Sequence, residues 1–133
     1  MRKIGVTGTR SGCTEQQLER LRQFLCRNIV DHGPTELHHG DCVGVDAEAA
    51  QVARAYGYKI VCHPPNKNGL RAFEEYDDTR KPKAYFNRNR DIVDETELLF
   101  VIPFQDIRQN HGGTWYTYDY AQMKKKTAII IWP

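Results

Sequence analysis

Short apolar runs alternate along the chain with longer segments in which apolar residues recur every three or four positions. This alternation predicts strands that take turns with helices. The run Leu98–Ile102 is continuously apolar, which is typical of a central strand buried on both faces. The predicted strands are 3–7, 35–39, 59–63, 98–102 and 128–132.

The segments between these runs carry helix signals. Thr14 and Gln17 have the spacing of a capping box, with Thr14 as the N-cap, and apolar residues then repeat at helical spacing to about residue 30. An alanine-rich helix is expected to begin at Asp46, as its N-cap, and to end at Gly57. Two more helices are predicted over 83–93 and 114–125.

Residues 64–82 break the alternation. The segment is long for a loop in a compact domain, and its acidic run 74–78 shows no strand pattern. Leu70, Phe73 and Tyr76 stand at helical spacing and predict a short helix. Two interpretations remain open, a binding loop or lid and a solvated insertion.

Strands that alternate with helices predict an α/β fold, because parallel neighbouring strands need right-handed crossover connections. We expect a single Rossmann-like domain over 1–133, a three-layer sandwich around a parallel five-stranded sheet of order 3-2-1-4-5. The chain then changes direction between the first and fourth strands. In open sheets of this kind, ligands bind at that switch point, beyond the carboxyl ends of the strands.

Composition narrows the class of protein. The chain has 133 residues, of which 40% are hydrophobic and 27% charged, as expected for a globular domain. A net charge of +2 is too small to indicate nucleic-acid binding by itself. No apolar run approaches the roughly 20 residues of a membrane span, and the N-terminus has no signal-like segment, so we expect a cytoplasmic protein that contacts no membrane.

The four cysteines are scattered and form no CxxC pair, so we expect reduced thiols. His38, His39 and Cys42 lie close together in sequence, but their spacing matches no common zinc pattern. We therefore expect no metal site and no bound cofactor.

The most prominent polar loop follows the first strand and contains Gly8, Thr9, Arg10 and Ser11. Glycine lets a phosphate approach the backbone, hydroxyls donate hydrogen bonds, and a guanidinium can pair with phosphate oxygens. This loop either forms one wall of a nucleotide-type site or is a glycine-rich turn with a surface arginine.

Two further glycine loops follow the second and fourth predicted strands. They contain Gly40, Asp41 and Gly44 in one case, and Gly112, Gly113 and Thr114 in the other. All three loops lie on one edge of the predicted sheet, each at a helix N-terminus, which favours a phosphate-bearing ligand. The alternative is that these glycines only make tight turns between strand and helix.

Several single side chains are candidates for the same site. Asp41 could accept a hydrogen bond from a ribose hydroxyl, whereas Asp46 is better placed to cap its helix. Arg88 is favoured over Arg90 as a ligand contact, since the two point to different helix faces. Trp115 and Tyr116 either stack on a base or belong to the core.

These motifs together resemble the SLOG superfamily, which includes the Lonely Guy phosphoribohydrolases and the DNA-processing protein A recombination mediators. The resemblance covers nearly the whole chain and is strongest to short stand-alone members. It implies a Rossmann-like fold, a ligand site at the glycine loops and a homo-oligomer, dimer or tetramer. It depends on Val6–Arg10, His39–Asp46 with the alanine-rich helix, Asn87–Asn89 and Gly112–Thr114.

The hydrolases of this superfamily carry a glutamate three residues after a glycine-threonine pair. Here Gly113 and Thr114 match the pair, but the glutamate position is Thr117, so Asp41 is the remaining candidate for a catalytic carboxylate. Three functions follow, in order of preference: a module that binds a nucleotide or a nucleotide-derived ligand, a nucleoside 5′-monophosphate phosphoribohydrolase, and a single-stranded DNA-binding protein. The small net charge makes nucleic acid the least favoured partner.

Overall fold

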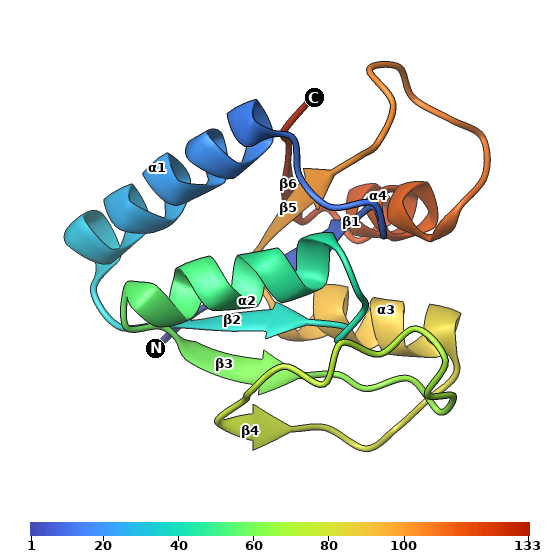
Figure 1. The fold of residues 1–133 in the computed structure, drawn as a ribbon, viewed down its shortest axis with the longest axis horizontal. Coiled ribbons are helices and arrows are strands. Elements are labelled where there is room, and N and C mark those ends of the chain that lie inside the picture. The colour runs from blue at the N-terminus through green and yellow to red at the C-terminus, as the bar shows by residue number, and fades with distance from the viewer.

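The computed structural model describes residues 1–133 and consists of one sheet with helices on both faces (Figure 1). Helices α1 and α2 pack on one face, and α3 and α4 pack on the other, so the molecule has three layers. No helix combines the length and the apolar character that crossing a membrane requires. The elements are β1 (Arg2–Gly8), α1 (Glu15–His32), β2 (Thr35–His39), α2 (Val45–Ala55), β3 (Lys59–Cys62), β4 (Asp78–Thr79), α3 (Tyr85–Glu95), β5 (Leu98–Ile102), α4 (Gly113–Met123) and β6 (Thr127–Ile130).

The sheet has the order β4-β3-β2-β1-β5-β6, and every strand pair is parallel. The α/β class and the predicted order of the five longer strands are therefore confirmed. The expected strand number is too low by one, because β4 adds a sixth strand at the edge. Two exposed residues carry no hydrophobic period, so the sequence pattern could not reveal β4.

The segment before β4 contains no helix, so the short helix predicted around Leu70–Tyr76 is wrong. Phe73 adopts a φ of 55°, in the left-handed region that interrupts a helix. Arg71 instead forms an isolated bridge with Cys42, next to the start of α2. Contacts with a distant loop, rather than helical packing, thus set the path of this segment.

Helix α1 begins with the predicted capping box. The Thr14 hydroxyl accepts the Gln17 backbone N–H at 3.0 Å, and the Gln17 side-chain oxygen accepts the Thr14 N–H at 2.9 Å. The Gln17 amide nitrogen also donates to the carbonyls of Pro103 and Ile131. One side chain therefore caps the helix and fastens it to the segments that follow β5 and β6.

Helix α2 begins differently from the prediction. Its N-cap is Gly44, with a φ of 89°, and Asp46 lies inside the first turn, so the expected capping role of Asp46 is wrong. The Asp46 carboxylate instead reaches back to the β2–α2 loop, where Oδ2 accepts the N–H groups of Gly40 at 3.0 Å and Cys42 at 3.3 Å. This helix start brings a buried carboxylate to the carboxyl edge of the sheet.

Candidate ligand-binding site

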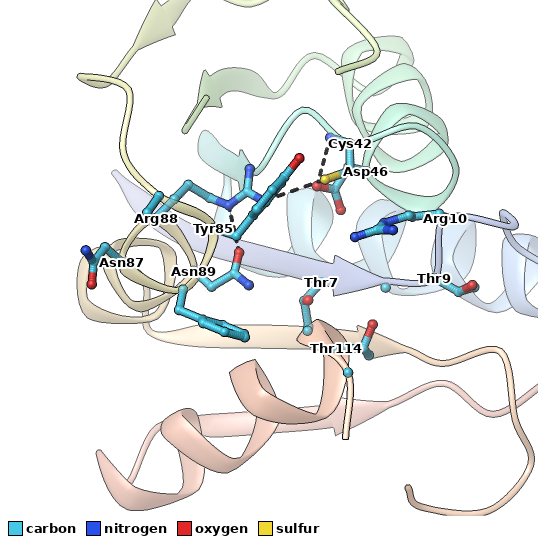
Figure 2. A pocket seen from close by; sticks show the side chains of 15 residues that line it. Thr7, Thr9, Arg10, Cys42, Asp46, Tyr85, Asn87, Arg88, Asn89 and Thr114 are labelled. Atoms are coloured by element: carbon cyan, nitrogen blue, oxygen red, sulfur yellow. Dashed lines mark hydrogen bonds between the residues drawn. The ribbon is translucent and has the colours of Figure 1, made fainter. Parts of the chain in front are cut away.

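A cavity of about 740 Å³ opens at the carboxyl edge of the sheet, where the chain changes direction between β1 and β5 (Figure 2). Its walls come from the end of β1, the β2–α2 loop, and the first turns of α3 and α4. Its position agrees with the switch-point rule for open parallel sheets. The cavity is lined by Thr7, Gly8, Thr9, Arg10, Cys42, Asp46, Ala84, Tyr85, Phe86, Asn87, Arg88, Asn89, Gly112, Gly113 and Thr114.

The structure brings most of the residues proposed from the sequence to this cavity, but not all of them. Those that line it are Gly8, Thr9, Arg10, Arg88, Gly112, Gly113 and Thr114. Ser11, Gly40, Asp41 and Gly44 lie outside its lining. The loops after β1 and β5 therefore reach the cavity through the proposed residues, and the loop after β2 reaches it through Cys42, with Asp46 from the start of α2.

The β1 loop presents a cation. Arg10 is exposed, and its guanidinium makes no hydrogen bond or ion pair with another residue. In Figure 2 its side chain extends from the end of β1 toward the side of the cavity where Asp46 lies. The Thr9 hydroxyl oxygen accepts the Ser11 N–H at 3.1 Å, which leaves the hydroxyl hydrogen free to donate. Ser11 therefore stabilises the loop from outside the cavity lining.

The start of α4 presents backbone donors. The N-cap is Gly112, with a φ of 95° and no side-chain cap, and the N–H groups of Gly113, Thr114 and Trp115 have no acceptor. Free donors at a helix N-terminus, together with the helix dipole, favour an anion. A side-chain carbon at Gly112 would meet nothing within 4 Å, so this loop is open.

Arg88 forms the floor between α3 and the β2–α2 loop and is only 4% exposed. Its Nε donates to Asn89 Oδ1 at 2.7 Å, Nη1 donates to the carbonyls of Gly40 and His63, and Nη2 donates to Cys42 Sγ at 3.6 Å. These bonds use four of the five guanidinium N–H donors. Arg88 therefore chiefly positions the loop, and one donor remains for a ligand.

The glycines of the β2–α2 loop are needed for close packing. A Cβ on Gly40 would lie 2.5 Å from Arg88 Nη1, so only glycine lets the guanidinium lie against the backbone. Gly44 has a φ of 89°, and a Cβ there would collide with the carbonyl of Arg10. These contacts favour the alternative given above, in which Gly40 and Gly44 allow a tight turn between strand and helix and do not bind a ligand.

Asp41 faces away from the cavity and is fully buried. Its Oδ2 accepts from Arg71 Nε at 2.9 Å in an ion pair, and Oδ1 accepts the Glu74 N–H at 3.2 Å. Its backbone is left-handed, with a φ of 56°. The carboxylate thus anchors the 64–82 segment against the β2–α2 loop.

Asp46 is the carboxylate that lines the cavity. Burial raises the pKa of its carboxyl to about 6, against the opposing effects of the Arg88 charge and the two backbone donors Cys42 and Gly40. The sequence favoured a helix-capping role for Asp46, so Asp46 was not among the predicted ligand-binding residues. Cys42 lies beside it, and burial raises the pKa of the Cys42 thiol, which keeps it protonated at neutral pH.

The first turn of α3 supplies the other residues that single-residue reasoning missed, although Asn87 and Asn89 stand in a motif on which the resemblance rests. Phe86 is exposed and packs on Tyr116 with ring centroids 4.3 Å apart. Trp115 is 3% exposed and packs edge-on against Tyr118, so it belongs to the core rather than to a stacking site. Aromatic surface at the cavity therefore comes from Tyr85 and Phe86.

Thr117, at the position of the family glutamate, is buried, and its hydroxyl donates to the Gly113 carbonyl at 2.7 Å. This back-bond within the helix is a common arrangement for a threonine. Thr117 offers neither a carboxylate nor a free hydroxyl to the cavity. Asp46 is consequently the one carboxylate among the lining residues.

A separate polar cluster lies under β2 and β3. The side-chain ligand atoms of His38, His63 and Glu95 lie within 4.8 Å of one another, a grouping that could hold a metal ion. His38 Nδ1 and His63 Nε2 are hydrogen-bonded at 2.8 Å, and His38 Nε2 is 2.8 Å from a Glu36 oxygen. Three of the four ring nitrogens of His38 and His63 are therefore accounted for by these contacts, and His63 Nδ1 has no hydrogen-bond partner.

The fold has solved relatives, although no protein-family model and no curated protein sequence matches the chain. The molybdenum cofactor binding protein of Rippkaea orientalis superposes with a TM-score of 0.71 at 22% identity, over 97% of this chain and 75% of that one. The molybdenum cofactor carrier protein of Chlamydomonas reinhardtii gives 0.68 at 21% identity, over 97% and 75%. DNA processing protein A of Streptococcus pneumoniae gives 0.66 at 15% identity, over 98% and 50%.

These three proteins and this chain share one fold. The chain shares their Rossmann-like fold, which is the fold that the resemblance of its motifs to the SLOG superfamily implies. At 15–22% identity the likeness concerns the fold alone. The function has to be argued from the cavity itself.

Proposed function

We propose that this protein binds a phosphate-bearing small molecule of nucleotide type in the cavity at the carboxyl edge of the sheet. The observation that carries the proposal is that free backbone donors of α4 and the unpaired Arg10 guanidinium border the same cavity. A phosphate there would receive charge-assisted hydrogen bonds from both. The volume of about 740 Å³ is in the range of small-molecule sites and exceeds what a lone phosphate needs.

The rest of the ligand would extend toward α3. Tyr85 and Phe86 offer aromatic surface, and Asn87 and Asn89 offer amide groups that both donate and accept hydrogen bonds. A flat heterocycle fits such a mixture of apolar faces and polar edges. The similar folds of two molybdenum cofactor proteins support a small-molecule role for this type of domain.

Two other functions have narrower support. Cleavage of a nucleoside 5′-monophosphate would need a carboxyl group near the glycosidic bond, and Asp46 supplies one with a pKa of about 6. Release of free base during incubation with a monophosphate would favour this activity. DNA binding is supported by the similar fold of the single-stranded DNA-binding DNA processing protein A from Helicobacter pylori, at a TM-score of 0.65 and 16% identity.

The proposal is tested by substituting Arg10 with glutamine. Since the Arg10 guanidinium makes no hydrogen bond or ion pair, the fold should be retained, whereas the affinity for nucleoside 5′-monophosphates should fall about 10- to 100-fold. Isothermal titration calorimetry measures the affinity. The matched control is Arg20→Gln, an exposed arginine of α1 that also has no partner, and its affinity should equal that of the wild type. Unchanged affinity in Arg10→Gln, or no nucleotide binding by the wild type, would refute the proposal.

We also propose that the protein is a homo-oligomer, a dimer or tetramer, as the superfamily resemblance implies. Size-exclusion chromatography with light scattering gives the mass in solution. The mass of a single chain would contradict this proposal.

A further inference from the structure

One oxygen of the Asp46 carboxylate has no protein partner. Oδ2 accepts both loop N–H groups, from Gly40 and Cys42, whereas Oδ1 receives no hydrogen bond although Asp46 lines the cavity. A carboxylate offers about four acceptor positions, so this oxygen is free to accept from a ligand. Figure 2 shows Asp46 beside Cys42 on one rim of the cavity and Thr114 on the other.

Charged groups from several elements surround this carboxylate. Among the charged groups, Arg88 of α3 has the strongest effect on the pKa of Asp46. Asp41 of the β2–α2 loop acts in the opposite direction and more weakly, and the Cys42 thiol is neutral. Arg10 extends toward Asp46 from the β1 loop but forms no ion pair with it (Figure 2). Because two cations already flank Asp46, a further cationic group is disfavoured there, and a neutral donor such as a hydroxyl is accommodated.

The cavity is therefore polarised. The α4 side offers free N–H donors, which suit phosphate oxygens, and Asp46 offers a free carboxylate oxygen, which accepts hydrogen bonds and therefore cannot bind a phosphate oxygen. A ligand satisfies both sides only if it carries an anion at one end and a hydrogen-bond donor at the other. The sugar hydroxyls of a nucleoside phosphate provide such a donor.

We propose that Asp46 Oδ1 accepts a hydrogen bond from a sugar hydroxyl of the ligand, and so makes the site selective for ribonucleoside phosphates over inorganic phosphate and over nucleotides that lack these hydroxyls. This inference rests on the proposed function. It transfers to Asp46 the role that sequence spacing had suggested for Asp41, whose carboxylate is already occupied by Arg71. A nucleotide without these hydroxyls would leave Asp46 Oδ1 without a hydrogen bond, and this cost lowers its affinity relative to the ribonucleotide.

The test compares the four ribonucleoside 5′-monophosphates with their 2′,3′-dideoxy counterparts by calorimetry at pH 8, with inorganic phosphate as a further probe. Wild-type protein should bind at least one ribonucleotide about 10-fold or more tightly than its dideoxy form. Asp46→Asn keeps one oxygen for the Gly40 and Cys42 donors but replaces the free acceptor with an NH₂ group. This variant should bind the two forms with equal affinity.

A second readout uses pH. In the wild type the ratio of ribonucleotide to dideoxynucleotide affinity should shrink as pH falls below about 6, where the Asp46 carboxyl takes up a proton. The phosphate titrates in the same range, but its contribution cancels in the ratio. In Asp46→Asn the ratio should not change with pH. Asp106→Asn, an exposed aspartate outside the lining, is the matched control and should behave like the wild type.

The outcomes separate the two proposals. If no nucleotide binds, the proposed function fails, and this inference fails with it. If nucleotides bind but the wild type does not distinguish ribo from dideoxy forms, only the assignment to Asp46 is overturned. The same conclusion follows if Asp46→Asn keeps the discrimination. Circular dichroism checks that the variant folds, and the wild-type comparison decides the matter if it does not.

Discussion

Gly40 must be glycine because a neighbouring side chain occupies the space that a Cβ would need. Its Cβ position is taken by the Arg88 guanidinium, whose donors hold the carbonyls of Gly40 and His63. A buried arginine is stable only when its donors are satisfied, and main-chain carbonyls supply two of the four acceptors here. The glycine and the arginine, 48 residues apart, therefore form one structural unit at the floor of the cavity.

Glu36 determines which ring nitrogens of the buried His38 and His63 donate hydrogen bonds and which accept them. Because the Glu36 carboxylate accepts from His38 Nε2, the neutral His38 ring has a bare Nδ1, which accepts from His63 Nε2. His63 Nδ1 is then buried and without a hydrogen-bond partner, 3.9 Å from a Glu95 carboxylate oxygen. Burial, with the neighbouring His38 and Arg80, lowers the pKa of His63 to about 3.

This arrangement predicts a pH dependence of stability. Between pH 6.5 and about 3 the unfolded chain binds a proton at His63 that the native state does not bind, so the free energy of unfolding falls as pH falls. The slope due to this group is about 1.4 kcal/mol per pH unit. His39, whose pKa is lowered to about 4, acts in the same sense, and Asp46 acts oppositely between 3.8 and about 6.

The measurement is urea unfolding at a series of pH values. His63→Gln keeps an N–H donor near His38 but removes the titrating group, so its free energy of unfolding should depend less steeply on pH in this range. His111→Gln replaces an exposed histidine of the β5–α4 loop and should keep the wild-type slope. Parallel curves for His63→Gln and the wild type would show that His63 titrates normally in the native state.

At the scale of single elements, α1 is the clearest case in which local sequence determines structure. Thr14 and Gln17 exchange both capping hydrogen bonds, as their spacing predicted. The 64–82 segment is the opposite case. Its path depends on the Arg71–Asp41 ion pair and on the Asp77 carboxylate, which accepts the Ile60 N–H at 2.7 Å, and no periodic pattern reports such contacts.

Loss of the α1 cap should be measurable. Thr14→Ala removes the acceptor for the Gln17 N–H and should lower the free energy of unfolding by about 1 kcal/mol. Urea denaturation measures the change. Gln16→Ala alters an exposed position in the same first turn that makes no side-chain hydrogen bond, and it should not destabilise the protein. Equal stability of Thr14→Ala and the wild type would mean that water replaces the cap without cost.

At the scale of the whole molecule, the sheet and helix α2 approach each other closely at the end of β1. Gly8 is in register with Ile102 of β5, and it also faces Val45 at the start of α2. A Cβ on Gly8 would lie 2.5 Å from Val45 Cγ1 and 2.8 Å from the Ile102 carbonyl oxygen. Gly8 also lines the cavity, so this close contact lies at its wall.

Gly8→Ala should therefore disturb the packing between layers. Overpacking of a close contact typically costs about 1–3 kcal/mol, so a loss of that size in the free energy of unfolding is expected. Gly69→Ala is the matched control, because a Cβ on Gly69 meets nothing within 4 Å and its φ is not positive. Thermal unfolding and urea denaturation compare the two variants. A Gly8→Ala protein as stable as Gly69→Ala would show that α2 can move away from the sheet.

The sequence by itself determined the α/β class, the order of the five longer strands and the edge at which the loops gather, because hydrophobic period and crossover handedness are properties of the chain pattern. Only the tertiary structure decided which side chains face the cavity. A left-handed turn and a partner 30 residues away direct Asp41 outward, while the start of α2 brings Asp46 to the cavity. Side-chain direction at a loop depends on distant partners, which local patterns do not encode.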